Sequence, residues 1–555
     1  MYQQVFDPVG DSLGLSSIFA AIPLLTLFVL LGGLKLKAQW AGLLALLAGL
    51  LVAIIVYGMP VGQALDSALL GAVFGLFPIM WIVVNAVWVY NMTVESGHFA
   101  VLRRSFATIS DDQRVQAVII AFCFGALLEA LAGFGTPVAI CSVMLMALGF
   151  QPIKAAAIAL VANTAPVAFG AIAIPIVTLA EITGLPKEDL GAMVGRQTPL
   201  LALFVPLILV GMVDGMRGVR QAWPAAVVGG FTFAFGQFVC SNYISVELTD
   251  IVASLLAVGA IVALLRVWQP SEPLIGERTS GPQPAIAGAS TSDPAFEADV
   301  RGRDGKDSSR DVATAYAPYA IIIVIFALAQ FGPIKDFLEG LTKEFGWPGL
   351  NITDPDGEAL STVTFKFNWA SAAGTLLLVA GLLTMVVLRL SPARALKAYV
   401  ATLNQLKWAI LTVAAVLGLA YVMNQSGQTT TLGLWAAGAG GIFAFLSPII
   451  GWLGVAVTGS DTSSNSLFGA LQVAAAKESG LSEVLLAAAN SSGGVMGKMI
   501  SPQNLAIGAA AVGMAGQEGD LFRRVLGWSL LLLLIMCVLV YLQSTSVLGW
   551  MVVGG

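Results

Sequence analysis

Long apolar runs alternate with short polar segments along most of this chain of 555 residues. Runs of 18 or more predominantly apolar residues recur between Leu13 and Leu548. About 20 such residues are enough for one helix to cross the hydrocarbon core of a bilayer. The pattern therefore predicts an all-α polytopic membrane protein with about twelve transmembrane helices. The predicted spans are 13–34, 39–58, 66–93, 155–179, 199–214, 222–241, 247–268, 316–332, 368–390, 404–424, 483–511 and 525–545.

Two further apolar stretches, 115–149 and 445–476, are interrupted midway by glycines and polar residues. ALAGFGTP stands at 130–137 and TGSDTSSN at 458–465. Irregular backbone at membrane depth is tolerated only where protein or water surrounds it, so neither stretch fits a simple span. We expect both to be re-entrant hairpins, and we call them the first and the second hairpin.

Two polar insertions separate the apolar segments. Residues 270–312 are rich in Pro, Gly, Ser and charge, a composition that does not bury enough apolar surface to fold. We expect a solvated, disordered loop there. A second insertion, 333–365, separates two predicted spans and is expected to hold short local structure.

Positive charge orients the predicted spans, because Lys and Arg in short loops stay on the cytoplasmic side. Lys35 and Lys37 follow the first span, and Arg104 follows the third. This places the N-terminus outside and the 270–312 loop in the cytoplasm. The later basic clusters, from Arg217 to Arg524, also fall on the cytoplasmic side only if the first hairpin enters the membrane from the cytoplasm and the second enters from outside.

Three short segments of the first half have counterparts in the second half, in the same order. VWVYNMTVESG (87–97) resembles GLAYVMNQSG (418–427), FGALLEALAGFG (124–135) resembles LGVAVTGSDTSS (453–464), and LVANTAP (160–166) resembles LAAANSS (486–492). The halves have opposite predicted orientations, and inverted repeats with a midplane site are typical of secondary transporters. The expected organisation is a first transport repeat at 1–214 with the first hairpin, two connecting spans at 215–269, a cytoplasmic polar loop at 270–312, and a second transport repeat at 313–555 with the second hairpin.

Composition excludes several function classes. The chain is 57% apolar and 11% charged, with a mean hydropathy of +0.87, whereas soluble proteins carry about 25% charged residues. Its surroundings are a lipid bilayer, and we expect no nucleic-acid partner. The four cysteines lie in apolar segments without metal-ligand spacing, so we expect no disulfide, metal or cofactor. The one histidine lies outside the predicted spans, which argues against an intramembrane enzyme.

Glu129 and Asp461 stand beside the two hairpin breaks at predicted membrane depth. An ionised carboxylate there costs about 2.5–3.5 kcal/mol even on insertion scales, so such residues usually serve transport or proton relay. We expect both to carry coupling protons, in an alternating-access carrier and not in a channel. The alternative is that each caps a broken helix by accepting hydrogen bonds from backbone N–H groups.

Lys498 is the one cation within the predicted span 483–511. A buried ammonium needs a partner. Lys498 is therefore expected to hold the substrate, to pair with Asp461 or Glu129, or else to extend its charge to an interface.

Four long segments point to a known family. FCFGALLEALAGFGTPVAI, NTAPVAFGAIAIPI, GWLGVAVTGSDTSSNSLFGALQ and ANSSGGVMGKMISPQNLAI closely resemble the bacterial L-lactate permeases. The resemblance extends over nearly all predicted spans and fails mainly in the two polar insertions. It implies a multi-pass protein of the bacterial inner membrane that imports L-lactate, glycolate or related 2-hydroxy monocarboxylates by proton symport. Sodium coupling is the alternative, because TSSN and NTAP supply oxygen ligands of the kind that Na⁺ prefers.

A carboxylate substrate of this kind suits the ends of broken helices, because helix N-termini present unpaired N–H groups with partial positive charge. Asn163 and Thr164 in one half, and Asn490 and Ser491 in the other, are expected to unwind their helices near the site. The candidate substrate-binding residues are Gly133, Gly135, Thr136, Asn163, Thr164, Thr462, Ser463, Ser464, Asn465, Asn490, Ser491 and Lys498.

Overall fold

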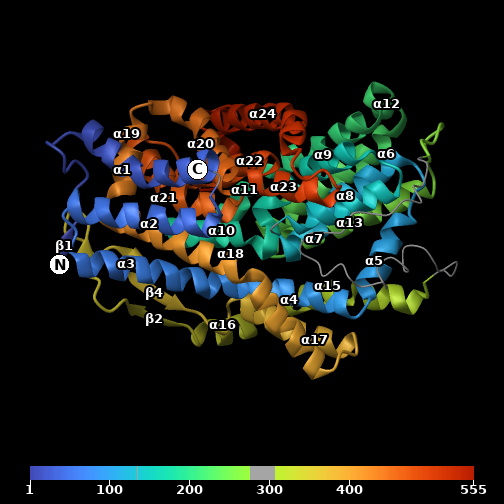
Figure 1. The fold of residues 1–555 in the computed structure, drawn as a ribbon, viewed down its shortest axis with the longest axis horizontal. Coiled ribbons are helices and arrows are strands. Elements are labelled where there is room, and N and C mark those ends of the chain that lie inside the picture. Colours follow the sequence, from blue (N-terminus) through green and yellow to red (C-terminus); the bar gives the residue numbers. More distant parts are fainter. Residues whose placement is uncertain (35, 134, 276–306, 330, 555) are drawn as a thin grey trace.

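The computed structural model describes residues 1–34, 36–133, 135–275, 307–329 and 331–554. Helices dominate these residues and pack side by side in an elongated bundle (Figure 1). Nine helices of the described chain are long and apolar enough to cross a membrane, or ten if one bent helix pair counts as a span. The protein is therefore a polytopic helical membrane protein.

Two of these nine helices, Gln113–Leu131 and Gly440–Thr458, are the first arms of the predicted hairpins. The predicted spans that are missing from the count are merged, broken or short helices. α12 (Thr198–Tyr243) combines two predicted spans and kinks near Gly215, whose φ is +59°. α13 (Thr249–Leu265) and α17 (Ala373–Val387) are only 17 and 15 residues long. The length of an apolar run in the sequence does not show where the backbone bends, nor where a helix ends within the run.

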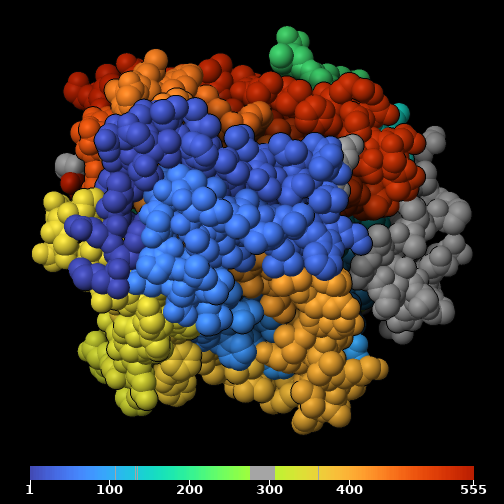
Figure 2. Space-filling view, turned by 60° about the vertical axis from the view of Figure 1, so that its left-hand side comes forward, coloured from blue at the N-terminus to red at the C-terminus, as the bar shows by residue number. Residues whose placement is uncertain are grey.

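The N-terminal helices pack with helices from the second half of the sequence. These elements are α1 (Leu13–Phe28), α2 (Ala38–Ile55), α3 (Val61–Phe74), α4 (Trp81–Glu95), α5 (His98–Ala107), α15 (Ser309–Ala329) and α18 (Pro392–Ser426). α18 contacts α2, α3 and α4, and Figure 2 shows the N-terminal segment in blue beside the orange segment. A Cβ on Gly71 would lie 2.4 Å from the Leu417 carbonyl oxygen, so glycine permits this close helix crossing.

The insertion predicted at 333–365 holds short local structure, as expected. It contains α16 (Gly332–Gly340), and β2 (Lys343–Gly346) pairs antiparallel with β4 (Thr364–Phe367). β3 (Ile352–Thr353) pairs parallel with β1 (Tyr2–Gln3) at the start of the chain. The insertion thereby fastens the N-terminal segment to the bundle.

Each predicted hairpin is a pair of packed helices joined by a short break. The elements are α6 (Gln113–Gln116), a π-helical stretch (Ala117–Phe124), α7 (Gly125–Ala132) and α8 (Thr136–Ala147) in the first, and α20 (Phe443–Thr458) and α21 (Asp461–Ser479) in the second. Gly135 and Gly459 have φ values of +83° and +76°, in the left-handed region that favours glycine. The TSSN segment therefore begins a helix and is not unwound.

Two helices are broken. α9 (Pro152–Ala162) and α10 (Gly170–Thr183) form the bent pair, with an angle of 64° between them. α22 (Glu483–Gly497) is followed by a short turn at Lys498–Ile500 and by α23 (Pro502–Ala511). α8 contacts α23, and α21 contacts α10. The second arm of each hairpin thus packs on the helix that follows the other break.

One expectation about these breaks is correct and one is wrong. α9 ends before Asn163, as predicted, but Asn490 and Ser491 lie inside the regular helix α22. Their side chains bond to α21 and leave the α22 backbone helical. The second break falls eight residues later, before Pro502, because proline has no N–H to continue the hydrogen-bond ladder.

Four further helical segments complete the bundle. They are α11 (Lys187–Val194), α19 (Gln428–Ala437), α24 (Glu518–Gln543) and a short C-terminal turn (Gly549–Met551). α24 contacts α20 and α22, and α13 contacts α7. The hairpins and broken helices are thus enclosed by other helices on several sides.

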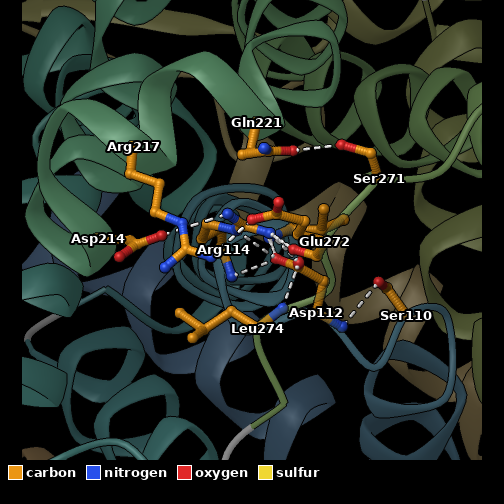
Figure 3. Close-up of polar contacts among 10 residues, drawn as sticks. Ser110, Asp112, Arg114, Asp214, Arg217, Gln221, Ser271, Glu272 and Leu274 are labelled. Carbon is orange, nitrogen blue, oxygen red and sulfur yellow. Dashed lines mark hydrogen bonds and ion pairs between the residues drawn. The ribbon is translucent and has the colours of Figure 1, made fainter.

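Most of the loop predicted at 270–312 lies outside the described residues, but its first residues contact the base of the first hairpin (Figure 3). Arg114 is buried and lies 2.6 Å from Asp112 and 3.2 Å from Asp214 at the α12 kink. It also donates to the Glu272 carbonyl, and the Leu274 amide donates to Asp112. Burial acts to raise the pKa of the Asp112 carboxyl, but hydrogen bonds from Arg114 and Leu274 hold this pKa below its usual range.

We expect Arg114→Met to destabilise the protein by about 3–5 kcal/mol, because it leaves the Asp112 carboxylate buried without its cation. Thermal unfolding of purified protein in detergent measures the effect. Arg217→Met is the control, since the Arg217 side chain is 66% exposed in its pair with Glu272 and exposed ion pairs contribute little. Equal unfolding temperatures for the two variants would contradict a stabilising role for the buried Arg114–Asp112 ion pair.

Candidate functional site

The first hairpin and both helix breaks meet at Glu129. Glu129 lies on α7 and Lys498 begins the turn between α22 and α23. Lys498 Nζ lies 2.5 Å from Glu129 Oε1, and Asn163 Nδ2 donates to Glu129 Oε2 at 3.0 Å. All three side chains are buried. Of the partners expected for Lys498, the structure selects Glu129, which is therefore an ion-pair partner and not a helix cap.

The backbone approaches this ion pair closely at the first break. A Cβ added to Gly170 would lie 2.9 Å from Glu129 Oε1. The next residues, Ala171, Ile172 and Ala173, have φ values of +45°, +58° and +56°. This left-handed conformation costs roughly 1–2 kcal/mol per residue. It persists where the surrounding structure imposes it, and such strain clusters at functional sites.

Asp461 is the second buried carboxylate, in the first turn of α21. Its Oδ2 accepts a hydrogen bond from Ser491 Oγ at 2.6 Å, and its Oδ1 has no hydrogen-bond partner within the described structure. The charge of Lys498 acts on it. The cap of α21 is Ser460, whose Oγ accepts from the Ser463 amide at 3.2 Å. Asp461 therefore does not fill the capping role that was its alternative.

Several expected substrate ligands bond instead to neighbouring helices. Asn465 Nδ2 donates to the Pro175 carbonyl at 3.0 Å, and Asn490 Nδ2 donates to Asn465 Oδ1 at 2.9 Å. Gln472 donates to Asn490 Oδ1, and Ser464 donates to a backbone carbonyl of α20. These bonds join α10, α20, α21 and α22. Their geometry supports a packing role for Ser464, Asn465 and Asn490.

The expected residues at the hairpin tips lie at helix starts. Thr136 begins α8, and its amide donates to the Gly133 carbonyl at 3.0 Å. A Cβ on Gly135 would lie 3.2 Å from Asn504 Oδ1 of α23, so the first hairpin tip contacts the second broken helix. Thr462 is the second residue of α21 and is half-buried.

Some of the buried polar atoms that lack a hydrogen-bond partner belong to residues at the two breaks or on the helices beside them. Within the described structure they are Asn163 Oδ1, Thr164 Oγ1, Asp461 Oδ1, Ser492 Oγ and Asn504 Oδ1. A buried polar group without a partner costs about 1–3 kcal/mol, and native proteins contain few of them. The breaks therefore hold unused hydrogen-bonding capacity for a polar ligand next to the ion pair.

Two residues of this site, Asn504 and Asp250, were not predicted from the sequence. Asn504 Nδ2 donates to the Lys498 carbonyl and to Ser501 Oγ, which holds the second break open. Asp250 on α13 is fully buried and interacts electrostatically with Glu129 and Lys498. The sequence feature that could have identified Asp250 is an acidic residue inside the apolar run 247–268. The signal for Asn504 was its place in the first turn after a proline.

Metal ligands do not gather in the described part of the chain. No group of three or more His, Cys, Asp or Glu side chains there is placed to hold a metal ion. The four cysteines are free and buried. The chemistry of the site rests on carboxylates, one ammonium, amides and hydroxyls.

The sequence matches known transporters over its whole length. A family model described as L-lactate permease matches residues 16–547. The L-lactate permease of Bacillus subtilis (strain 168) is 41% identical over 99% of this chain and 100% of that protein. The glycolate permease GlcA of Escherichia coli (strain K12) is 41% identical over 99% of both chains.

Two solved structures are more distantly similar. The YdaH transporter of Alcanivorax borkumensis gives a TM-score of 0.42 at 15% identity, covering 83% of this chain and 84% of that one. MtrF of Neisseria gonorrhoeae gives 0.45 at 14% identity, covering 84% and 81%. These scores are low, and the assignment rests on the full-length sequence matches. The chain belongs to the L-lactate permease family, whose members are multi-pass membrane transporters and not enzymes.

Proposed function

We propose that this protein imports L-lactate, glycolate or a related 2-hydroxy monocarboxylate together with a proton, by alternating access in the bacterial inner membrane. The names of the full-length relatives support the substrate class. The observation that carries the coupling is the buried Glu129–Lys498 ion pair at the junction of the two broken helices.

We also propose that the chain consists of two inverted repeats, 1–214 and 313–555, joined by connecting spans and the cytoplasmic loop, with the N-terminus outside. The same order of elements supports this, since a helical hairpin precedes a broken helix in each half. Reciprocal packing supports it further, since each hairpin contacts the other half's broken helix. On this plan both hairpins are re-entrant and reach the midplane, where broken helices form transporter sites.

Charge balance explains why lactate and a proton bind together. In the empty site the Lys498 ammonium is neutralised by the Glu129 carboxylate. A lactate carboxylate can pair with Lys498 only if Glu129 gives up that ion pair. The Glu129 carboxylate would then be buried without a cation, which costs several kcal/mol. Protonation of Glu129 removes that cost. The loaded and the empty site then carry the same net charge, and both forms cross the low-dielectric barrier.

The 2-hydroxyl and the carboxylate of the substrate need several donors and acceptors. The unpartnered atoms of Asn163, Thr164 and Asn504 lie at the breaks beside Lys498. Asp461 carries a second protonatable oxygen near the same ammonium. These residues recognise a small anion that also bears a hydroxyl group.

We expect Glu129→Gln to abolish lactate accumulation driven by a pH gradient while exchange of lactate for lactate continues. The amide does not take up the coupling proton, but exchange never requires the empty carrier to release it. Uptake of labelled lactate into proteoliposomes measures both. Glu188→Gln is the control, because that side chain is 75% exposed. Uphill uptake at the wild-type rate would remove Glu129 from the mechanism.

The charge balance also predicts an electroneutral cycle. A membrane potential acts with about 2.3 kcal/mol per elementary charge per 100 mV, but one anion with one proton carries no net charge. We expect an imposed potential or a Na⁺ gradient, without a pH gradient, to drive no lactate accumulation in proteoliposomes. Strong uptake under the potential would indicate extra protons, and uptake under the Na⁺ gradient would establish sodium coupling.

A substitution at Gly494 on α22 tests whether Asp461 must keep a fixed position for transport. A Cβ there would lie 2.3 Å from Asp461 Oδ1, so Gly494→Ala must displace the carboxylate. We expect transport to slow by about tenfold or more, which corresponds to about 1.4 kcal/mol in the barrier. Gly259→Ala is the matched control, because a Cβ at Gly259 meets no atom within 4 Å. Wild-type transport by both variants would show that Asp461 needs no fixed position.

A further inference from the structure

A third buried carboxylate lies near the site, on a helix that the sequence assigns only a connecting role. Asp250 is in the first turn of α13 and is fully buried. Its Oδ1 accepts a hydrogen bond from Gln237 Nε2 at 3.0 Å, and its Oδ2 has no hydrogen-bond partner within the described residues. No positively charged side chain bonds to it in that part of the chain. A buried carboxylate in this setting calls for an explanation.

Helix capping does not explain Asp250. No side chain caps α13, whose N-cap residue is Leu248. The carboxylate points instead to Gln237 on α12, which is also fully buried. The same amide nitrogen of Gln237 donates to the Ala165 carbonyl at 3.2 Å. Asp250 is thereby linked through one side chain to the break that follows Asn163.

Several charged and titratable groups lie near Asp250 in the structure or along the sequence. Toward the site, Glu129 on α7 and Lys498 before α23 act on it electrostatically, and Cys240 on α12 also interacts with it. Along the sequence, Glu247 precedes Asp250 by three residues and forms an ion pair with Lys187 at 2.5 Å. The Lys187 side chain is 29% exposed. Asp250 is thus three residues from a partly exposed ion pair and interacts electrostatically with the buried one.

We propose that Asp250 is a further proton-carrying residue, which exchanges protons with Glu129 and is positioned by Gln237. The proton leaves the Asp250 carboxyl and binds the Glu129 carboxylate as Lys498 exchanges Glu129 for the substrate carboxylate as its ion-pair partner. Asp250 is then ionised and takes the next proton from the face that bears Lys187 and Glu247. This inference rests on the proposed proton symport.

The unpartnered Oδ2 is consistent with this role. A protonated Asp250 is neutral and gains a donor, so the protein interior tolerates it better than an unpaired charge. The ionised form ends when Asp250 takes the next proton, which restores the net charge of the site. Gln237 contributes a neutral donor that serves both forms and keeps the carboxyl beside the break.

Asp250→Asn in proteoliposomes tests the proposal, with Ser254→Ala as the control one turn further along α13. Ser254 is buried and donates only within its own helix, to the Ile251 carbonyl. We expect Asp250→Asn to slow uptake driven by a pH gradient by about tenfold or more, equivalent to about 1.4 kcal/mol. Lactate exchange at equal pH should stay near the wild-type rate, and the pH profile of uptake should lose one ionisation.

Each outcome separates this inference from the proposed function. If purified wild-type protein takes up no proton when lactate is added, the proton symport itself fails. If wild-type protein takes up a proton and Asp250→Asn keeps wild-type uptake, or loses uptake and exchange equally, the role of Asp250 is overturned. Should Asp250→Asn not fold, Gln237→Leu replaces it. That variant removes the positioning bond, and the same selective loss of uptake is expected.

Discussion

The buried ion pair of Glu129 and Lys498 is the interaction on which the rest of the structure depends. Two opposite charges removed from water are stable only when they are paired and their remaining hydrogen-bonding capacity is used. Asn163 supplies that further hydrogen bond. The pair joins residues 369 positions apart, so the first hairpin and the second broken helix hold each other in place. Any change of charge at this point acts on both.

Broken helices make such a pair useful for transport. A continuous helix satisfies its own N–H and C=O groups and offers a ligand nothing but side chains. At Asn163 and at Lys498 the helices end, and Pro502 prevents the second from continuing. Protein surrounds the backbone at both breaks, which is the condition under which non-helical backbone is tolerated inside a bilayer. Close helix contacts at glycines, as at Gly170 beside Glu129, provide that enclosure.

The peripheral elements keep the site aligned and contribute to it. The Asp112–Arg114 pair fixes the base of the first hairpin to the α12 kink, and the strand pair β1–β3 fastens the N-terminus. α12 and α13 do more than connect the two halves, because they place Gln237 and Asp250 against the first break. The residues that contact the breaks therefore come from both halves of the sequence and from the segment between them.

The sequence by itself determined the membrane class, the family, the two hairpins, the first break and the acids beside the hairpin tips. These follow from apolar length and from local motifs, which are properties of consecutive residues. Helix packing gives the pairing of Lys498 with Glu129, the role of Asn490 in joining helices, and the link of Asp250 through Gln237 to the first break. Those outcomes depend on which helices lie side by side. In a membrane protein, close packing of small residues and interhelical hydrogen bonds select the neighbours, and local periodicity does not encode them.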